Sequence, residues 1–404
     1  MPSPDHEIDE REQMQIKLKP GKEKSVLNRH PWIFSGAIAK PLDKFYPDVE
    51  VVSSSGQFLG RGYYNPSSQI SCRIVTFNNQ KIDRELLKSK LEASIFLRKS
   101  ILTPLNNAAR LVASEADQLP GLIVDQYDKI LVVQFLTSGM EYYREIIIDL
   151  LKEILNPRTI WDRSDEPVRE KEGLLQTSGL IYGDDVDGLT EITEHGYRLL
   201  VDIKSGHKTG FYLDQRTNRL QIGNLASGLR ILNCFSYTGG FTVAALLGKA
   251  KEVVSVDVSA PALEILNQNL AINGSLTGSS IIKADVFEYL RKSKEEGEQF
   301  DMIILDPPKF INNKADIDRA ARGYKDINRL AFQLLKPNGL LATFSCSGHM
   351  DDFLFQKIVF SAAVEANCNG QLVNKFMQSS DHPILLTFPE SSYLKGLLVR
   401  KVHS

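Results

Sequence analysis

The chain has 404 residues, enough for two or three domains, of which 42% are hydrophobic and 24% charged. This composition excludes an intrinsically disordered or fibrous protein. The formal net charge of −2 hides an uneven distribution, because residues 16–110 hold sixteen Lys and Arg against seven Asp and Glu, whereas residues 111–200 hold eight against eighteen. The first of these segments is basic enough to bind a phosphate-bearing partner.

The sequence carries no signal for membrane insertion, secretion or metal binding. No apolar run approaches the ~20 residues that cross a bilayer, and residues 1–15 are too polar for a secretory leader. The four cysteines form no C-x-x-C pair, which argues against a zinc site and a disulfide framework. We therefore expect a cytoplasmic protein with free thiols, no bound metal and no membrane partner.

The N-terminal part of the chain predicts a tail followed by a small β-barrel. Residues 1–13 are expected to form a flexible polar tail. Within residues 14–85, short strand-like runs alternate with turns that contain glycine or proline, as in a PUA-like barrel. These runs cover residues 14–18, 50–52, 58–64 and 70–76.

Residues 86–200 are expected to form a linker helix and a small central α+β domain. Asp83 is placed to cap a helix that runs to about residue 101, and a second amphipathic helix covers residues 140–155. Glu115 and Asp117 carry no recognisable chemistry and are expected to lie in a solvated turn. Apolar runs predict four short strands, at residues 122–125, 130–135, 159–161 and 199–201.

Residues 201–404 are expected to form an α/β domain of the doubly wound, Rossmann-like type. Five apolar strands alternate with amphipathic helices, a rhythm typical of a parallel sheet covered on both faces. Ligands of such sheets bind beyond the carboxyl ends of the strands. The predicted strands are residues 230–235, 253–257, 281–285, 302–306 and 340–345, and the predicted helices are 241–247, 260–272, 286–294 and one that ends at 335.

The carboxyl ends of these strands carry glycines and acids suited to an adenosine ligand. Gly239 and Gly240 permit a sharp turn and close approach of a ligand to the backbone. Asp257 follows at the distance of an acid that binds ribose hydroxyls. The G-x-G-x-x-G pattern of pyrophosphate binding is absent, so the adenosine ligand is expected to lack a pyrophosphate. For each acid alone, the simpler interpretation is a helix N-cap.

The fourth and fifth strands end in a candidate catalytic pair, Asp306 and Cys346. Pro307 and Pro308 fix the chain direction after Asp306, whose carboxylate can hydrogen-bond a flipped base. Cys346 ends the neighbouring strand, so its thiol is expected to face Asp306. Carbon is a poor nucleophile, and methylation at C5 of a pyrimidine therefore needs a thiolate that adds at C6. The alternative for Cys346 is a small buried residue, which is also the interpretation of Cys234.

Several motifs together resemble the bacterial ribosomal RNA large-subunit methyltransferase I family. They are Lys19-Pro-Gly-Lys22, His30-Pro-Trp-Ile-Phe34, Ser114-Glu-Ala-Asp117, Leu119-Pro-Gly-Leu-Ile-Val-Asp125 and Lys208-Thr-Gly-Phe-Tyr-Leu-Asp-Gln-Arg216. The resemblance covers the chain from about residue 15. It implies an N-terminal RNA-binding PUA domain, a C-terminal class I methyltransferase domain that uses S-adenosylmethionine, and 5-methylcytosine in large-subunit rRNA as the product. It also implies a homodimer.

The strand ends and this resemblance together define the candidate site residues. Cys346 would attack the base, and Asp306 would hold it. The candidate cofactor-binding residues are Phe211, Tyr212, Asp214, Asn233, Phe235, Ser236, Tyr237, Gly239, Asp257, Val258, Asp285, Val286 and Asp306. The candidate RNA-binding residues are the basic side chains Lys19, Lys22, Lys24, Arg29 and Lys309.

Two alternatives remain open at this point. Many cytosine-C5 RNA methyltransferases carry a second cysteine after the prolines, where this chain has Lys309, so the base that removes the C5 proton is not identified. N-methylation of a purine such as guanine uses the same architecture and needs no thiolate. A non-catalytic RNA-binding factor is the second alternative, against which Gly239, Asp257 and Asp285 indicate a cofactor pocket in use.

Overall fold

The computed structural model describes residues 14–310, 316–348 and 350–402, which form two compact units. The first unit holds residues 14–99, 110–185 and 384–389, and the second holds the remainder. The chain therefore passes between the units several times. The tail predicted at residues 1–13 lies outside the described residues.

The first unit begins with a small five-stranded β-structure, as the sequence predicts. Its strand order is β1-β3-β4-β5-β2, and its core includes Ile16, Val51 and Ile74. The aromatic ring of Trp32 packs edge-on against that of Phe388, with 4.7 Å between the ring centroids. The elements are β1 (Gln15–Lys17), α1 (Lys24–Leu27), β2 (Trp32–Ile33), η1 (Ser35–Ala37), β3 (Tyr46–Val52), β4 (Phe58–Tyr64) and β5 (Cys72–Thr76).

The rest of the first unit contains a second sheet, of order β10-β9-β8-β7-β6, with helices beside it. Asp83 caps α2, because its carboxylate accepts a hydrogen bond from the Leu86 amide at 2.9 Å. The predicted helix at 140–155 is divided at Tyr143 into two helices. The elements are α2 (Arg84–Arg98), β6 (Ala108–Ala113), η2 (Ser114–Asp117), β7 (Leu122–Tyr127), β8 (Ile130–Phe135), α3 (Ser138–Tyr142), α4 (Arg144–Leu155), β9 (Thr159–Ser164), η3 (Pro167–Glu172) and β10 (Thr177–Gly183).

The solvated turn predicted around Glu115 and Asp117 is wrong. Asp117 accepts hydrogen bonds from two guanidinium nitrogens of the buried Arg98, both at 2.7 Å. Glu115 accepts the indole N–H of Trp32 at 2.8 Å. Both acids accept hydrogen bonds from residues distant in sequence. Because these partners satisfy the carboxylates, the segment can pack in the interior of the unit.

The second unit is built on a seven-stranded sheet of order β15-β14-β13-β16-β17-β19-β18. The five strands that the sequence predicts run parallel, and the predicted neighbours β16 and β17 are adjacent. The last two strands, which the sequence did not predict, are antiparallel to their neighbours. The strands are β13 (Arg230–Cys234), β14 (Glu252–Asp257), β15 (Ser279–Lys283), β16 (Phe300–Leu305), β17 (Leu335–Ser345), β18 (Asn369–Met377) and β19 (Lys395–Val402).

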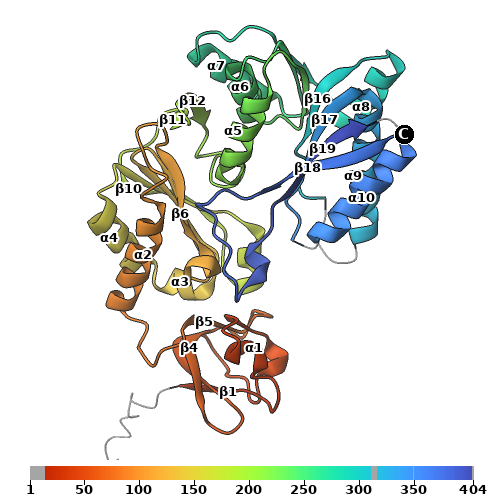
Figure 1. The fold of residues 1–404 in the computed structure, drawn as a ribbon. Helices are drawn as coiled ribbons and strands as arrows, with labels where there is room; N and C mark the ends of the chain where they lie inside the picture. The colour runs from red at the N-terminus through yellow and green to blue at the C-terminus, as the bar shows by residue number, and fades with distance from the viewer. Residues whose placement is uncertain (1–13, 311–315, 349, 403–404) are drawn as a thin grey trace, which may run out of the picture. The chain divides into compact units, whose positions relative to one another are not determined.

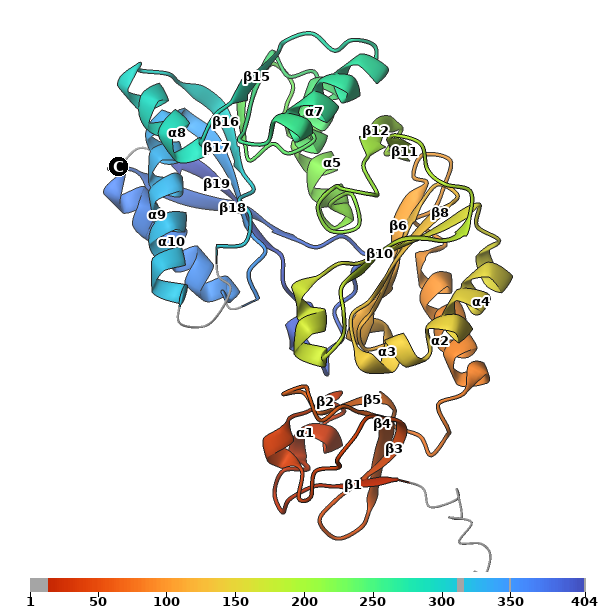
Figure 2. The same cartoon turned by 180° about the vertical axis from the view of Figure 1, so that it is seen from behind.

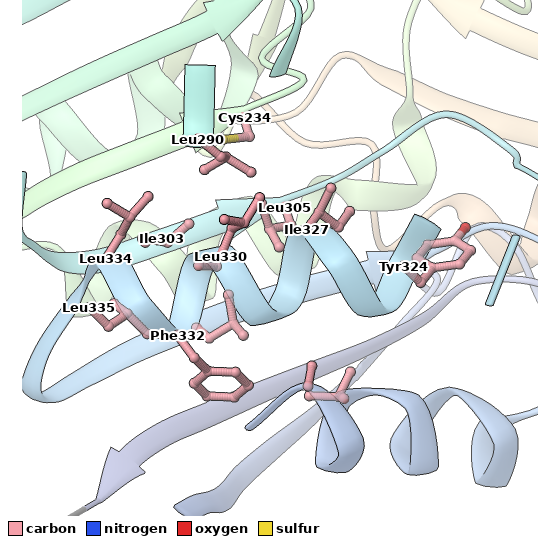
Figure 3. Close-up of a cluster of buried hydrophobic side chains, with 14 of the residues drawn as sticks. Cys234, Leu290, Ile303, Leu305, Tyr324, Ile327, Leu330, Phe332, Leu334 and Leu335 are labelled. Atoms are coloured by element: carbon pink, nitrogen blue, oxygen red, sulfur yellow. The ribbon is translucent and has the colours of Figure 1, made fainter. Parts of the chain in front are cut away.

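Helices cover both faces of this sheet, which confirms the doubly wound α/β prediction (Figures 1 and 2). One apolar side of α9 packs on the sheet, with Ile327 and Leu330 beside Ile303 and Leu305 of β16 (Figure 3). Cys234 lies in the same cluster, as expected of a small apolar residue. The helices are α5 (Arg216–Leu225), α6 (Gly240–Leu247) and α7 (Ala260–Ile272) on one face, and α8 (Val286–Glu295), α9 (Ile317–Leu334) and α10 (Asp352–Glu365) on the other.

A hairpin of β11 (Thr190–Glu194) and β12 (Tyr197–Val201) also belongs to the second unit, although the sequence analysis places residues 186–200 in the central domain. The Leu200 amide donates to the Asn269 side chain on α7 at 2.7 Å. The carboxylate of Glu194 accepts two hydrogen bonds of 2.6 Å from Arg219 on α5. Within the described ranges, no helix is long and apolar enough to cross a membrane.

Candidate active site

The turn after β13 has the tight backbone that its glycines predict. Gly239 adopts φ +81°, and a Cβ atom at this position would lie 2.4 Å from Cγ of Leu266. Two non-glycine residues of the same turn, Phe235 and Tyr237, also have positive φ angles of 58° and 47°. Such backbone conformations are costly and cluster at functional sites. The residue types around the turn gave no sign of this strain.

Asp257, at the end of β14, holds this turn in place. Its carboxylate accepts hydrogen bonds from the backbone amides of Tyr237 at 2.8 Å and Ser259 at 2.9 Å. The side chain is therefore directed at the glycine turn. Each carboxylate oxygen has more than one lone pair, so a ribose hydroxyl can be accepted in addition. The adjacent Val258 side chain is exposed.

Three other predicted cofactor residues have structural roles in the protein. Asp285 caps α8, because its carboxylate accepts the Glu288 amide at 3.1 Å. Val286 packs in the hydrophobic core. Asn233 is buried in β13, where its side-chain amide donates to the Thr242 hydroxyl at 2.9 Å. Buried side chains such as those of Val286 and Asn233 leave mainly backbone atoms for contact with a ligand.

Aromatic side chains from residues 207–212 gather against the glycine turn. The rings of His207 and Tyr237 are stacked, with centroids 4.8 Å apart, and the Tyr237 hydroxyl accepts the His207 amide at 2.9 Å. Tyr212 packs edge-on against Tyr237 at 5.5 Å. Phe211 lies under the guanidinium of Arg219, which is 4.5 Å from the ring centroid. The structure thus brings together Phe211, Tyr212 and Tyr237, and adds His207, which the sequence analysis missed.

Asp306 follows β16 and is the most electrostatically perturbed acid of this region. The Gln215 side chain donates a hydrogen bond to its carboxylate. Burial raises the pKa of Asp306 to about 7, and the negative charge of Asp214 adds to the rise. The positive charge of Arg219 and the hydrogen bond from Gln215 oppose it. Asp306 therefore exchanges its proton near neutral pH, a property typical of catalytic acids.

Cys346 follows β17, whose residue Thr343 is paired with Leu305 directly before Asp306. Its side chain is partly exposed, whereas those of the other three cysteines are buried. Burial raises the pKa of the Cys346 thiol to about 11, and the charges of Asp306 and Asp214 contribute to the rise. Cys346 and Asp306 therefore follow the ends of adjacent strands, and the direct approach of thiol and carboxyl stays a prediction.

Asp214 lies in the short helix η4 (Leu213–Gln215) and is fixed from the C-terminal part of the chain. One carboxylate oxygen, Oδ2, accepts the Tyr393 hydroxyl at 2.7 Å. The backbone carbonyl of Asp214 accepts the Ser379 amide at 2.8 Å and the Ser379 hydroxyl at 3.0 Å. The other oxygen, Oδ1, is buried and has no hydrogen-bond partner within the described residues. Tyr393 and Ser379 were missed because nothing in their sequence context marks them.

A buried lysine supports the backbone just after the thiol. Lys395 of β19 donates to the backbone carbonyls of Ser347 at 2.8 Å and Tyr393 at 2.9 Å. Burial lowers the pKa of Lys395, while nearby negative groups, including Cys346, oppose the change. The residue was missed because the sequence analysis did not predict β19. It holds the position of the loop that carries Cys346.

The predicted RNA-binding residues divide between the two units. Lys22, Lys24 and Arg29 are exposed on the first unit. Lys19 is exposed there too, and its ammonium donates to the Gly36 carbonyl at 3.0 Å. Lys309 is exposed in the second unit. The first unit has a cavity of about 360 Å³, lined by Lys22, Ser25, Trp32, Ile33, Phe34, Gly36 and Ala37.

The described residues include no group of three His, Cys, Asp or Glu side chains that could hold a metal ion.

Two solved structures share the fold over 96% of this chain and 100% of their own. One, from Streptococcus mutans, is described as a SAM-dependent methyltransferase (TM-score 0.84, 21% identity). The other is described as a methyltransferase complexed with SAH (TM-score 0.85, 22% identity).

Family models match two parts of the chain, a PUA-like domain at residues 16–77 and an S-adenosylmethionine-dependent methyltransferase at residues 178–387. The chain is 47% identical to the ribosomal RNA large subunit methyltransferase I of Erwinia tasmaniensis, over 96% of this chain and 100% of the relative. It is 49% identical to that of Tolumonas auensis, over 96% and 99%. The chain therefore belongs to the ribosomal RNA large subunit methyltransferase I family and is a methyltransferase that uses S-adenosylmethionine.

Proposed function

We propose that this protein methylates C5 of a cytosine in large-subunit rRNA, with Cys346 as the covalent nucleophile. The observation that carries the proposal is the partly exposed Cys346 thiol at the end of β17, beside the Asp306 carboxyl at the end of β16. The names of the relatives from Erwinia tasmaniensis and Tolumonas auensis support the RNA class. An rRNA substrate places the protein with ribosomes in the cytoplasm.

The residues around the glycine turn fit S-adenosylmethionine. The absence of a Cβ at Gly239 lets the turn pack closely against Leu266, and Asp257 is directed at the same turn. The aromatic rings of Tyr212 and Tyr237 lie beside it. When bound, the cofactor supplies a methyl group on a positively charged sulfur. Asp257 would accept the ribose hydroxyls, and the aromatic rings would favour the positive charge.

The catalytic pair has the chemistry that an unreactive pyrimidine carbon requires. Cys346 transfers its proton to the Asp306 carboxylate, and the thiolate adds at C6 of the flipped cytosine. Asp306, whose pKa burial raises to about 7, then carries this proton and donates a hydrogen bond to the ring nitrogen N3. This donation stabilises the negative charge that spreads from C5 into the ring. C5 can then accept the methyl group.

The first unit would bind the RNA backbone. Lys22 lines the cavity at Trp32 and Phe34, and Lys24 and Arg29 are exposed on the same unit. Basic side chains contact phosphates, which position an RNA without reading its sequence, and exposed aromatic rings can stack on unpaired bases. Recognition of the RNA and chemistry on the base would therefore reside in different units.

The Cys346→Ser variant tests the proposal. Because a hydroxyl is a far weaker nucleophile than a thiolate, methyl transfer to large-subunit rRNA should fall at least about 1000-fold. Nucleoside mass spectrometry should find 5-methylcytosine with the wild type and none with the variant. Cys368→Ser is the matched control, because Cys368 is a buried cysteine whose thiol contacts the Ala363 carbonyl of α10, and it should retain activity.

One observation favours a second candidate, methylation of a purine nitrogen. Lys309 stands where a second cysteine assists product release in many cytosine-C5 enzymes. A nitrogen nucleophile needs no covalent adduct, so Cys346→Ser would then keep its activity, and mass spectrometry would find a methylated guanine.

A further inference from the structure

Methylation at C5 leaves a proton that the protein has to remove. After the methyl group is added, C5 carries both a hydrogen and a methyl group, and C6 is still bonded to sulfur. The C5 proton must depart before the double bond can form again and release Cys346. Lys309 follows the two prolines and offers no thiolate for this step. A base elsewhere in the second unit must therefore take the proton.

We propose that Asp214 is this base and that its Oδ1 atom accepts the C5 proton, an inference that rests on the C5 function proposed above. Asp214 and Gln215 are neighbours in η4, and the Gln215 side chain hydrogen-bonds the Asp306 carboxylate. The turn thus lies against the residue that holds the cytosine. Lys395 joins the backbone carbonyl of Ser347, next to Cys346, to that of Tyr393, whose hydroxyl donates to Asp214. The charge of Asp214 also acts on Asp306 and Cys346, so these groups lie in one region of the second unit.

One oxygen of the Asp214 carboxylate is fixed by a hydrogen bond, and the other has no hydrogen-bond partner among the described residues. Tyr393 donates to Oδ2 at 2.7 Å, and Ser379 holds the backbone carbonyl through two hydrogen bonds. Oδ1 is buried, and no described residue donates to it. A buried hydrogen-bond acceptor without a donor lowers the stability of a folded protein, so its presence needs an explanation. Acceptance of a substrate proton provides one.

The other described groups near the thiol are less suited to this step. Asp306 is engaged with the ring nitrogen in the proposed mechanism. Burial and the charge of Asp306 raise the pKa of the Tyr212 phenol, so it stays protonated and cannot accept a proton. The Lys395 ammonium is a donor to two backbone carbonyls. His207 is exposed and contacts Tyr212 and Tyr237 instead.

The step balances in atoms and electrons. The Asp214 carboxylate forms an O–H bond with the C5 proton, and the electron pair of the C5–H bond forms the C5–C6 double bond. The C6–S bond breaks, and its electron pair returns to Cys346 as a thiolate. The products are 5-methylcytosine, a free thiolate and a protonated Asp214, which later loses its proton to water.

The test compares full-length wild type and Asp214→Asn on two RNAs. In vitro transcribed large-subunit rRNA is prepared with cytidine or with 5-fluorocytidine, which has no C5 proton to remove. Methyl-labelled S-adenosylmethionine is added, and labelled protein–RNA adducts are separated on a denaturing gel. On cytidine RNA, the variant should lose at least about 100-fold in turnover. It should also accumulate a methylated adduct that the wild type does not retain.

The 5-fluorocytidine RNA separates removal of the C5 proton from the attack and methyl transfer that precede it. Wild type and Asp214→Asn should both be trapped on it to the same extent, because attack and methyl transfer do not need Asp214. Asp187→Asn is the matched control, since it makes the same substitution at an exposed aspartate of the second unit that lies outside the proposed site. It should turn over cytidine RNA without accumulating adduct.

Three outcomes would overturn the inference. Wild-type turnover by Asp214→Asn shows that another base acts. Failure of this variant to be trapped on 5-fluorocytidine RNA, with weakened binding of S-adenosylmethionine, shows that Asp214 serves the cofactor. Failure of the wild type to be trapped contradicts the C5 mechanism itself, and so separates the failure of the proposed function from that of its base.

Discussion

At the scale of single residues, two titrations set the pH dependence of the proposed attack. Burial raises the pKa of Asp306 to about 7 and that of the Cys346 thiol to about 11. In the active form, the Asp306 carboxyl and the Cys346 thiol together carry one proton. Before attack, either of the two groups can hold it. The population of the active form therefore rises as pH increases to about 7 and stays constant from there to about 11.

This behaviour predicts a plateau in the rate of methyl transfer. Single-turnover rates measured from pH 5.5 to 9 should rise about tenfold per pH unit and level off near pH 7, because proton loss from Asp306 then offsets the growing thiolate fraction. In Asp306→Asn only the thiol titrates, so the slower rate should continue to climb through pH 9. A wild-type rate that climbs without a break would contradict the assignment of Asp306.

Residue types at strand ends could be predicted, but their partners could not. Asp306 and Cys346 lie on adjacent strands because a parallel sheet places its carboxyl ends along one edge. Asp285 caps a helix, which is the simpler interpretation of these acids, whereas Asp257 is directed at the glycine turn and its cofactor role stays a prediction. Tyr393 approaches Asp214 from far along the chain, and no local pattern encodes such a pairing.

At the scale of elements, the turn after β13 is the most constrained part of the site. Gly239→Ala should destabilise the protein by about 3 kcal/mol, because it combines a strained positive φ with a steric clash. The clash is with Leu266, 2.4 Å from the new Cβ. Gly228→Ala is the control, since Gly228 has φ +76° and open space around it, and should cost about 1 kcal/mol. Urea unfolding measures both, and equal midpoints would contradict the packing argument.

The β11–β12 hairpin, which the sequence analysis placed in the central domain, is attached to the second unit by a long-range ion pair. Glu194 and Arg219 are buried together and join the β11–β12 hairpin to α5. A buried charge needs its partner, so this pair fixes the hairpin to the second unit. Strand periodicity predicts that β12 forms, yet it carries no information on which unit receives it. The polar, exposed sequence of β18 likewise gave no strand signal, because its edge position does not require apolar alternation.

At the scale of the whole molecule, the charge asymmetry of the sequence predicts where RNA binds. The double variant Lys22→Glu/Lys24→Glu should weaken RNA binding and lower the slope of log affinity against log salt concentration by about 2, because two phosphate contacts are lost. Affinity for S-adenosylmethionine should not change. Lys292→Glu is the control, since Lys292 is an exposed lysine on α8 of the second unit. Equal salt slopes for wild type and double variant would exclude this surface.

Residues 384–389 belong to the first unit but follow most of the second unit in the chain. This order determines when the first unit can be completed during translation. Phe388 packs on Trp32, a ring that lines the cavity beside Lys22. At about 5–20 residues per second, a translating ribosome needs tens of seconds between these two positions. The nascent N-terminal barrel thus lacks one aromatic neighbour until nearly all of the catalytic sheet has been made. A truncated product released early carries the lysines but never the completed aromatic surface.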